Sequence, residues 1–368
     1  INITLRKRSL SELSNMASEI RLANNNNKSF EITTVEMHTA GEPLRVITSG
    51  YPEIKGDTIL AKRRYVTENL DHIRKLLMRE PRGHSEMCAA LLVTPDHEKA
   101  DLAVLFMHNG GYSVMCGHAV IALGRYAVDY GLVNRKPIAT GSVAVHIQCP
   151  CGLLKAMVEI TNGISGKVKF TSVPAFAFAV DLKLQTKSYG EVTVDVGFGG
   201  TFYALISDKE LGLDIRKTSA VKLATAAKEI MEVCSEDVKV THPEADDLAF
   251  VFGCIITDGR DQFAEFRDEP SRQMCYYGKA GGVDRSPCGS GVTARIAVQY
   301  HKRQIALSQS RVFESIVGSK FTGSPVQETK IGEFSAVSVD VEGLANYCGK
   351  GQYTLEQNDP FQEGFLVK

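Results

Sequence analysis

The chain has 368 residues, of which 43% are hydrophobic and 23% are charged, and its formal net charge at pH 7 is −1. A chain longer than about 250–300 residues rarely folds around one core, so we expect two domains. The near-neutral charge excludes the strongly basic character that nucleic acids or anionic membranes attract. No apolar run approaches the ~18 residues of a membrane-spanning helix.

The first 29 residues become asparagine-rich towards their end, and we predict a flexible leader there. Alternating and β-branched residues then predict strands at 30–37, 44–48, 88–93, 102–108, 142–148, 153–160, 167–172 and 175–182. A helix is predicted over 58–78, because apolar residues from Val66 to Leu77 recur at the spacing of one helical face.

The second half of the chain repeats this order. Strands are predicted at 192–196, 202–206, 248–257 and 262–266, and an amphipathic helix is predicted over 219–234. In each half, strands are followed by a helix, more strands, a cysteine-containing loop, a second helix and further strands. We place the boundary between residues 185 and 186, where lysine-rich polar residues precede a new set of strands.

Two features exclude common kinds of site. The nine cysteines show neither the paired spacing of a disulfide framework nor the Cys/His pairs of a zinc site. We therefore expect free thiols, no metal and a reducing, cytoplasmic location. The glycine cluster at 197–200 lies between two predicted strands and opens no helix, which argues against a dinucleotide-binding fingerprint.

One short stretch occurs twice, at 110–122 and at 281–294. Each copy has a Gly-Gly pair, a short loop, Cys-Gly, a Val four residues after the cysteine and an Ala six residues after it. The cysteines are Cys116 and Cys288, and each precedes a predicted buried helix. The repeat predicts two related halves, each of which presents one thiol where a helix begins.

A thiol at a helix start is suited to chemistry, because the positive end of the helix dipole lowers the pKa of a cysteine there. The glycine that follows lets a ligand approach the backbone N–H groups, which bind anions. If the halves face each other, two helix starts converge on one carboxylate and two thiols flank the neighbouring carbon. One thiolate then removes the Cα proton and the other thiol protonates the opposite face, which inverts the centre.

Other interpretations of these residues remain open. Buried cysteines are common in protein cores, and the two thiols also suit a redox pair or a small-anion cleft without catalysis. His118 is either an acid beside the thiol or a polar residue at a helix start. Asp284 binds a substrate amine or caps the second helix. We attribute Glu42 to the polarity of a turn, as we do His38, Arg82 and His84.

These residues resemble the proline racemase family, which includes 4-hydroxyproline epimerases and trans-3-hydroxy-L-proline dehydratases. The resemblance runs from about Phe30 to the C-terminus. Its motifs are at 38–43, 80–84, 115–118, 197–204 and 284–291. Ala40 stands where the family usually has glycine.

The resemblance implies an α/β fold like that of diaminopimelate epimerase. It has two pseudo-symmetric halves, here 30–185 and 186–344, each with a curved, mostly antiparallel sheet around a central helix, and 345–368 return to the first half. It also implies a homodimer without a cofactor, whose partner is a small-molecule substrate.

The family's site residues carry over to matching positions. Cys116 and Cys288 would form the acid/base pair. Residues that would hold the substrate carboxylate and amine are Gly117, His118, Asp284, Gly289 and Ser290. Residues that would line the ring pocket are Cys88, Phe106 and Tyr277.

The amino-acid sequence as a whole most resembles the animal trans-3-hydroxy-L-proline dehydratases. Those enzymes carry Thr at the position where this chain has Cys288. Dehydration needs one base on one face of the ring, whereas a second thiol allows reprotonation from the other face. From Cys288 we therefore predict a racemase or epimerase that acts on proline, with 4-hydroxyproline as the next candidate. Dehydration of trans-3-hydroxy-L-proline to a pyrroline-2-carboxylate is the alternative prediction.

Overall fold

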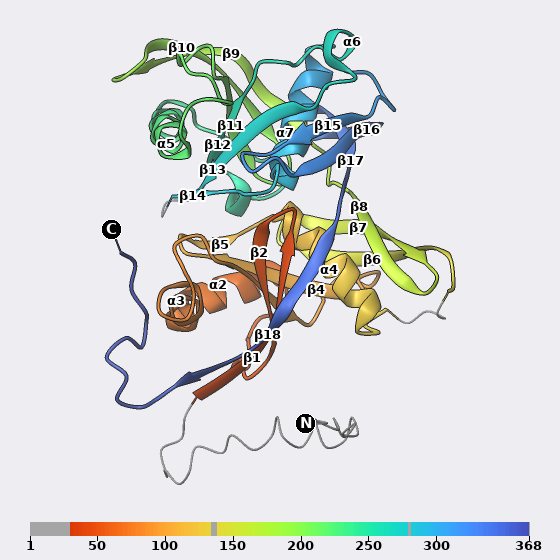
Figure 1. Ribbon diagram of the computed structural model, residues 1–368, viewed down its shortest axis with the longest axis vertical. Helices are drawn as coiled ribbons and strands as arrows, with labels where there is room; N and C mark the ends of the chain where they lie inside the picture. The colour runs from red at the N-terminus through yellow and green to blue at the C-terminus, as the bar shows by residue number, and fades with distance from the viewer. Residues whose placement is uncertain (1–29, 134–137, 279–280, 368) are drawn as a thin grey trace, which may run out of the picture.

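The first and last long strands of the chain pair with each other. The computed structural model describes residues 30–133, 138–278 and 281–367, so the predicted leader at 1–29 lies outside the described residues. In it, β1 (Phe30–Thr39) lies antiparallel between β18 (Ala345–Leu355) and β2 (Glu42–Ser49). The C-terminal strand therefore belongs to the lower lobe of Figure 1, which holds β1–β8 and α2–α4.

The sheet of the lower lobe continues from β2 in a mixed order. β3 (Cys88–Val93) is parallel to β2 and antiparallel to β4 (Leu102–His108). β4 then pairs with the short β5 (Gly111–Ser113) in antiparallel fashion and with β6 (Gly141–Cys149) in parallel. β7 (Gly152–Thr161) and β8 (Ile164–Thr171) complete the sheet by antiparallel pairing.

The upper lobe repeats this pattern strand by strand. Its strands are β9 (Phe176–Thr186), β10 (Gly190–Phe198), β11 (Phe202–Ser207), β12 (Val251–Thr257), β13 (Ser271–Tyr277), β14 (Gly282–Val283), β15 (Arg311–Glu314), β16 (Lys320–Ile331) and β17 (Phe334–Gly343). The parallel pairs β11–β12 and β13–β15 correspond to β2–β3 and β4–β6 of the lower lobe. The remaining pairs are antiparallel in both lobes, and β17 also pairs with β8, which joins the two sheets.

Each sheet curves around one buried helix. α4 (Gly117–Asp129) packs inside the lower sheet and α7 (Gly289–His301) inside the upper one, and both are almost entirely buried. α2 (Ile59–Asn69) and α3 (Asp71–Met78) cover the other face of the lower sheet, as α5 (Ala220–Asp237) covers that of the upper. The predicted fold class, with two pseudo-symmetric halves, is confirmed.

Side chains of β4 point alternately to the two faces of the sheet, so this strand contributes to two hydrophobic cores. Leu102, Val104 and Phe106 point into the core around α4, whereas Leu105 and Met107 point into the core under α2 and α3. Successive side chains of a strand face opposite sides of the sheet, so a strand covered on both faces is apolar throughout. None of the helices described is long and apolar enough to cross a membrane.

Two predicted elements are wrong in detail. The helix predicted over 58–78 is broken at Leu70, whose backbone (φ −126°, ψ 14°) leaves the helical region between α2 and α3. The strand predicted at 262–266 is instead a single helical turn, α6 (Phe263–Phe266). The strand that pairs with β12 is β13, which follows it. The buried apolar spacing of Val66, Ile73 and Leu77 continues across the break at Leu70, so periodicity does not reveal it, whereas the few apolar residues at 262–266 suit a strand as well as a helical turn.

The predicted boundary between residues 185 and 186 falls within β9, close to the turn that leads to β10. β9 and β10 pair along most of their length, and β9 also packs against α5 and α7. The division of the chain into 30–185 and 186–344 remains a prediction.

Candidate functional site

The two cysteine loops meet where the two buried helices begin. Cys116 is the residue before α4 and Cys288 the residue before α7. The following glycines touch: a Cβ placed on Gly117 would lie 2.5 Å from the Cα of Gly289, and one placed on Gly289 would lie 2.7 Å from the Cα of Gly117. Glycine after each cysteine is therefore required by the contact between the helices, in addition to any ligand.

All ten residues predicted for the site line one pocket between the lobes. They are Cys88, Phe106, Cys116, Gly117, His118, Tyr277, Asp284, Cys288, Gly289 and Ser290. The structure brings them together, and the roles assigned to them remain predictions. The cavity has a volume of about 30 Å³, so the two lobes are nearly closed over it.

Corresponding strands of the two lobes supply the pocket walls. Cys88 begins β3 and Phe106 lies in β4, while Tyr277 ends β13, the counterpart of β4. A cleft of about 1080 Å³ between α2 and α5 shares two residues, His108 and Phe252, with this pocket. Their rings are 5.5 Å apart and lie edge to face, so they separate the cleft from the pocket.

Cys116 has a basic partner. Its Sγ lies 3.4 Å from Nδ1 of His118, and Nε2 of His118 lies 3.3 Å from the carbonyl oxygen of Pro43. A carbonyl oxygen only accepts hydrogen bonds, so we assign the ring proton to Nε2, which leaves Nδ1 free to accept the thiol proton. Burial lowers the pKa of His118 to about 4, so the ring is neutral at pH 7. A neutral Nδ1 at this distance can accept a hydrogen bond from the Cys116 thiol.

The expectation that the helix start lowers the pKa of Cys116 is wrong for this structure. Burial raises the pKa of the Cys116 thiol well above its ordinary value. A backbone hydrogen bond from Ala119 lowers it, but Asp284, Cys288 and Glu42 raise it further. A desolvated thiolate near other acidic groups is more costly than the helix dipole can offset. The raised pKa favours the thiol form of Cys116 over the thiolate.

Cys288 has different surroundings, so the two thiols are not equivalent. Its Sγ lies 3.5 Å from the Tyr203 hydroxyl and 3.8 Å from the Ser290 hydroxyl, which are 2.9 Å from each other. Its backbone has φ 65°, a left-handed conformation that is uncommon outside glycine, whereas Cys116 is extended with φ −147°. The partners of Cys116 and Cys288 are thus an imidazole in one case and hydroxyl groups in the other.

Two buried carboxyl groups lie at the pocket: Asp284 lines it, and Glu42 lies behind it. Glu42 is fully buried, and Asp284 is 4% exposed. Burial raises the pKa of Asp284 to about 6, while burial and the charge of Asp284 raise that of Glu42 well above its ordinary value. Burial thus favours the protonated form of both carboxyl groups, and the charge of either one raises the cost of charging the other. The helix-cap interpretation of Asp284 is not supported, because Cys288 occupies that position and Asp284 accepts from the Ser286 N–H at 2.8 Å.

Sequence reasoning missed Glu42. It lies at the start of β2, where polarity alone suggested a turn, yet Tyr277 and the backbone N–H of Arg285 donate to its carboxyl group at 3.1 and 2.7 Å. Tyr203 was also missed, although it lies within the motif at 197–204. Arg82, by contrast, binds the C-terminal segment at Asp359 and at the backbone of Thr354.

One group of side chains has the spacing of a metal site. Among the described residues, ligand atoms of Glu42, Cys88 and His118 lie within 4.8 Å of one another. Both nitrogens of His118 already have hydrogen-bond partners, Cys116 and the carbonyl oxygen of Pro43. We assign no metal here.

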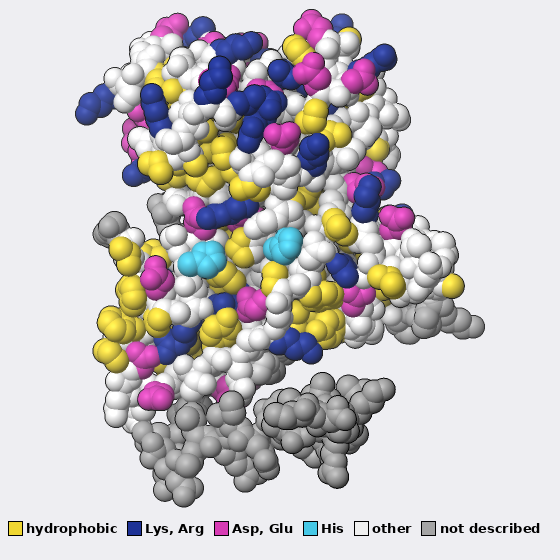
Figure 2. All heavy atoms as spheres, in the orientation of Figure 1, with side chains coloured by type: hydrophobic (Ala, Val, Ile, Leu, Met, Phe, Trp, Pro, Cys, Tyr) yellow, Lys and Arg dark blue, Asp and Glu magenta, His cyan; other side chains and the backbone are white. Residues whose placement is uncertain are grey.

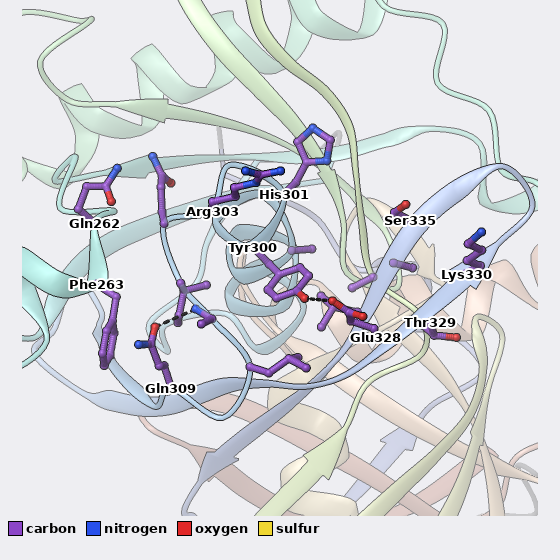
Figure 3. A pocket seen from close by; sticks show the side chains of 18 of the residues that line it. Gln262, Phe263, Tyr300, His301, Arg303, Gln309, Glu328, Thr329, Lys330 and Ser335 are labelled. Carbon is purple, nitrogen blue, oxygen red and sulfur yellow. Dashed lines mark hydrogen bonds between the residues drawn. The ribbon is translucent and has the colours of Figure 1, made fainter.

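Another cavity among the described residues lies away from this site. A cavity of about 920 Å³ lies at the C-terminal end of α7, where Tyr300 donates a hydrogen bond to Glu328 (Figure 3). None of the ten predicted residues lines it. Acidic and basic side chains are mixed over both lobes on the face shown in Figure 2, in keeping with the small net charge.

Comparisons with known proteins match nearly the whole chain. The proline racemase family profile matches residues 34–366. A trans-L-3-hydroxyproline dehydratase of Saccoglossus kowalevskii is 54% identical over 333 residues, which are 90% of this chain and 100% of the relative. The human trans-3-hydroxy-L-proline dehydratase is 49% identical over 339 residues, 92% of this chain and 95% of the relative.

A solved structure agrees with the fold. The hydroxyproline epimerase of Agrobacterium vitis with bound trans-4-hydroxy-L-proline superposes with a TM-score of 0.84 at 27% identity. The match covers 92% of this chain and 95% of the epimerase.

These findings overturn the prediction of a racemase or epimerase. Relatives that share from 39% to 54% of their residues over the length of the chain are dehydratases, which favours the alternative prediction. The error was to give Cys288 more weight than the rest of the chain. A thiol at that position offers a proton donor, but it does not decide whether a hydroxyl group leaves after deprotonation. By the family profile and by these relatives, the chain belongs to the proline racemase family.

Proposed function

We propose that the protein dehydrates trans-3-hydroxy-L-proline to a pyrroline-2-carboxylate. The observation that carries this proposal is the similarity, over the whole chain, to dehydratases of that substrate at 54% and 49% identity. The pocket between the two cysteine loops supports it, because it combines a thiol, a neutral imidazole and buried carboxyl groups in one place.

In the proposed reaction, Cys116 is the base. His118 takes the thiol proton, and the thiolate then removes the Cα proton of the substrate. A double bond forms between Cα and C3 as the bond from C3 to its hydroxyl oxygen breaks, and the hydroxyl leaves with a proton as water. The enamine product then tautomerises to the imine. No electron acceptor is needed, since the reaction is an elimination.

The charges around the pocket support binding of an amino-acid zwitterion. The first turns of α4 and α7 present N–H groups that have no partner within their own helices, and these suit the substrate carboxylate. The same groups stabilise the negative charge that develops when the Cα proton leaves. We assign the substrate ammonium group to the Asp284 carboxylate, because Asp284 lines the pocket whereas Glu42 does not.

Only one thiol is needed for this elimination, and we assign no proton transfer to Cys288. Its hydroxyl partners, Tyr203 and Ser290, do not act as bases at neutral pH. The homodimer implied by the family stays a prediction.

The test is an assay with three substrates: trans-3-hydroxy-L-proline, trans-4-hydroxy-L-proline and L-proline. We expect the first to lose water and give a pyrroline, and the other two to give none. The Cys116→Ser variant should abolish pyrroline formation because it removes the base. A protein that forms no pyrroline from trans-3-hydroxy-L-proline would refute the proposal.

A further inference from the structure

The stereochemistry of the proposed substrate fixes where an acid must lie. In trans-3-hydroxy-L-proline the hydroxyl group is on the ring face opposite the carboxylate, which is the face that carries the Cα proton. The base that removes this proton and the acid that protonates the departing hydroxyl must therefore approach from the same side. This step rests on the proposed function, and it requires an acid on the Cys116 side of the pocket.

The structure has proton-bearing groups on that side. Cys116 contacts His118, and the ligand atoms of Glu42 and Cys88 lie within 4.8 Å of a His118 nitrogen. The Tyr277 hydroxyl lies 3.1 Å from Oε1 of Glu42 and 3.5 Å from Sγ of Cys88. Tyr277 lines the pocket, whereas Glu42 is fully buried behind it. Tyr277 thus connects the pocket to a carboxyl group that has no exposed surface.

We propose that Tyr277 protonates the departing 3-hydroxyl group and that Glu42, acting through Tyr277, supplies the proton. The phenol O–H bond breaks as the proton moves to the hydroxyl oxygen, and the C3–O bond electrons leave with that oxygen as water. The hydrogen bond that Tyr277 donates to Oε1 of Glu42 at rest then reverses, and the Glu42 carboxyl proton moves across the same contact to restore the phenol. The proton taken from Cα remains on the Cys116–His118 pair, and its return to Glu42 restores the resting enzyme.

The surroundings of Glu42 suit this role. Burial and the charge of Asp284 raise the pKa of Glu42 well above its ordinary value, which favours the protonated form that a proton donor needs. Its other oxygen, Oε2, accepts a hydrogen bond from the Arg285 N–H at 2.7 Å, which orients the carboxyl group towards Tyr277. The competing role is purely structural: Glu42 holds the Arg285 segment in place and takes no part in proton transfer.

The proton-supplying role and the structural role of Glu42 predict different defects when it is replaced: loss of the 3-hydroxyl step alone, or loss of Cα deprotonation as well. We would assay Glu42→Gln and Tyr277→Phe with trans-3-hydroxy-L-proline in D2O, and measure both pyrroline formation and deuterium at Cα of the recovered substrate. Loss of the acid should slow pyrroline formation about 100-fold or more. Removal of the Cα proton should continue in the variants. The ratio of deuterium gained at Cα of recovered substrate to pyrroline formed should therefore be higher than with the wild type.

The chain offers a matched control pair. Tyr300 and Glu328 are also a hydrogen-bonded tyrosine and glutamate, but they lie at the cavity of Figure 3 and away from the thiols. Glu328→Gln and Tyr300→Phe make the same chemical changes there, and both should keep the wild-type rate and the wild-type ratio of exchange to product.

The outcomes separate this inference from the function on which it rests. If wild type forms pyrroline and both site variants match it, the inference is overturned alone. If pyrroline formation and Cα exchange fall together in the variants, Glu42 and Tyr277 hold the site in shape and the inference is again overturned. If wild type forms no pyrroline, the proposed function fails and this inference fails with it.

Discussion

Because Gly117 and Gly289 are in contact, we expect that adding one methyl group at Gly117 lowers both activity and stability. In Gly117→Ala the new Cβ would lie 2.5 Å from the Cα of Gly289 and 2.8 Å from the nitrogen of Ser290. Carbon atoms in contact are normally about 3.5–4.0 Å apart, so the starts of α4 and α7 would have to separate by about 1 Å. Both neighbours are backbone atoms, which cannot turn away as a side chain can.

This displacement acts on the thiols directly, because Cys116 and Cys288 precede the two glycines. A misplacement of about 1 Å can cost 10²-fold in rate, and overpacking costs about 1–3 kcal/mol of unfolding free energy. We therefore expect Gly117→Ala to lower kcat/KM for pyrroline formation by about 100-fold. The assay is steady-state kinetics together with urea unfolding of the same preparation.

Gly124→Ala is the matched control. Gly124 lies about two turns further along α4, and its added Cβ would meet the Val168 side chain at 2.9 Å and Ala156 at 3.3 Å. This variant should lose a similar amount of stability but keep most of its activity. Wild-type kcat/KM in Gly117→Ala, or equal losses of activity in the two variants, would refute the reasoning from the helix contact.

The remaining predictions concern the groups around the thiols. Cys116→Ser should lower the rate of pyrroline formation by at least about 10³-fold, because a serine hydroxyl is a far weaker acid than a thiol. Cys288→Ser should lower the same rate at most about tenfold. A larger loss would show that Cys288 transfers a proton. The pH profile of kcat/KM should fall as the pH drops through about 6, where Asp284 takes up a proton and loses the charge that holds the substrate ammonium. This limb should vanish in Asp284→Asn, and a limb near pH 4 in wild type would instead indicate His118.

Much of the fold could be predicted from the sequence because the two cysteine motifs share a pattern that only related halves explain. The order of elements then followed from hydrophobic periodicity in long segments such as α5 and β4. The break at Leu70 and the single turn at Phe263–Phe266 depend on a few residues, where periodicity cannot separate helix from strand or one helix from two.

The lining of the pocket was predicted through the motifs, but its electrostatics were not. Glu42 and Tyr277 are 235 residues apart, so their hydrogen bond has no signal in local sequence. The pKa of Cys116 depends on how much water the closed lobes exclude, which outweighs the local effect of the helix start. The functional prediction was wrong because it rested on the residue type of Cys288 alone. The sequence does not show that the partners of this thiol are the hydroxyl groups of Tyr203 and Ser290.

The proposed dehydration is tested most directly by incubating the purified protein with trans-3-hydroxy-L-proline and following the ring carbons by NMR. We expect the C3 hydroxyl to be lost and a pyrroline-2-carboxylate to accumulate with the wild type but not with Cys116→Ser. Inversion at Cα with the 3-hydroxyl retained, or pyrroline formation that survives the loss of the Cys116 thiol, would contradict it.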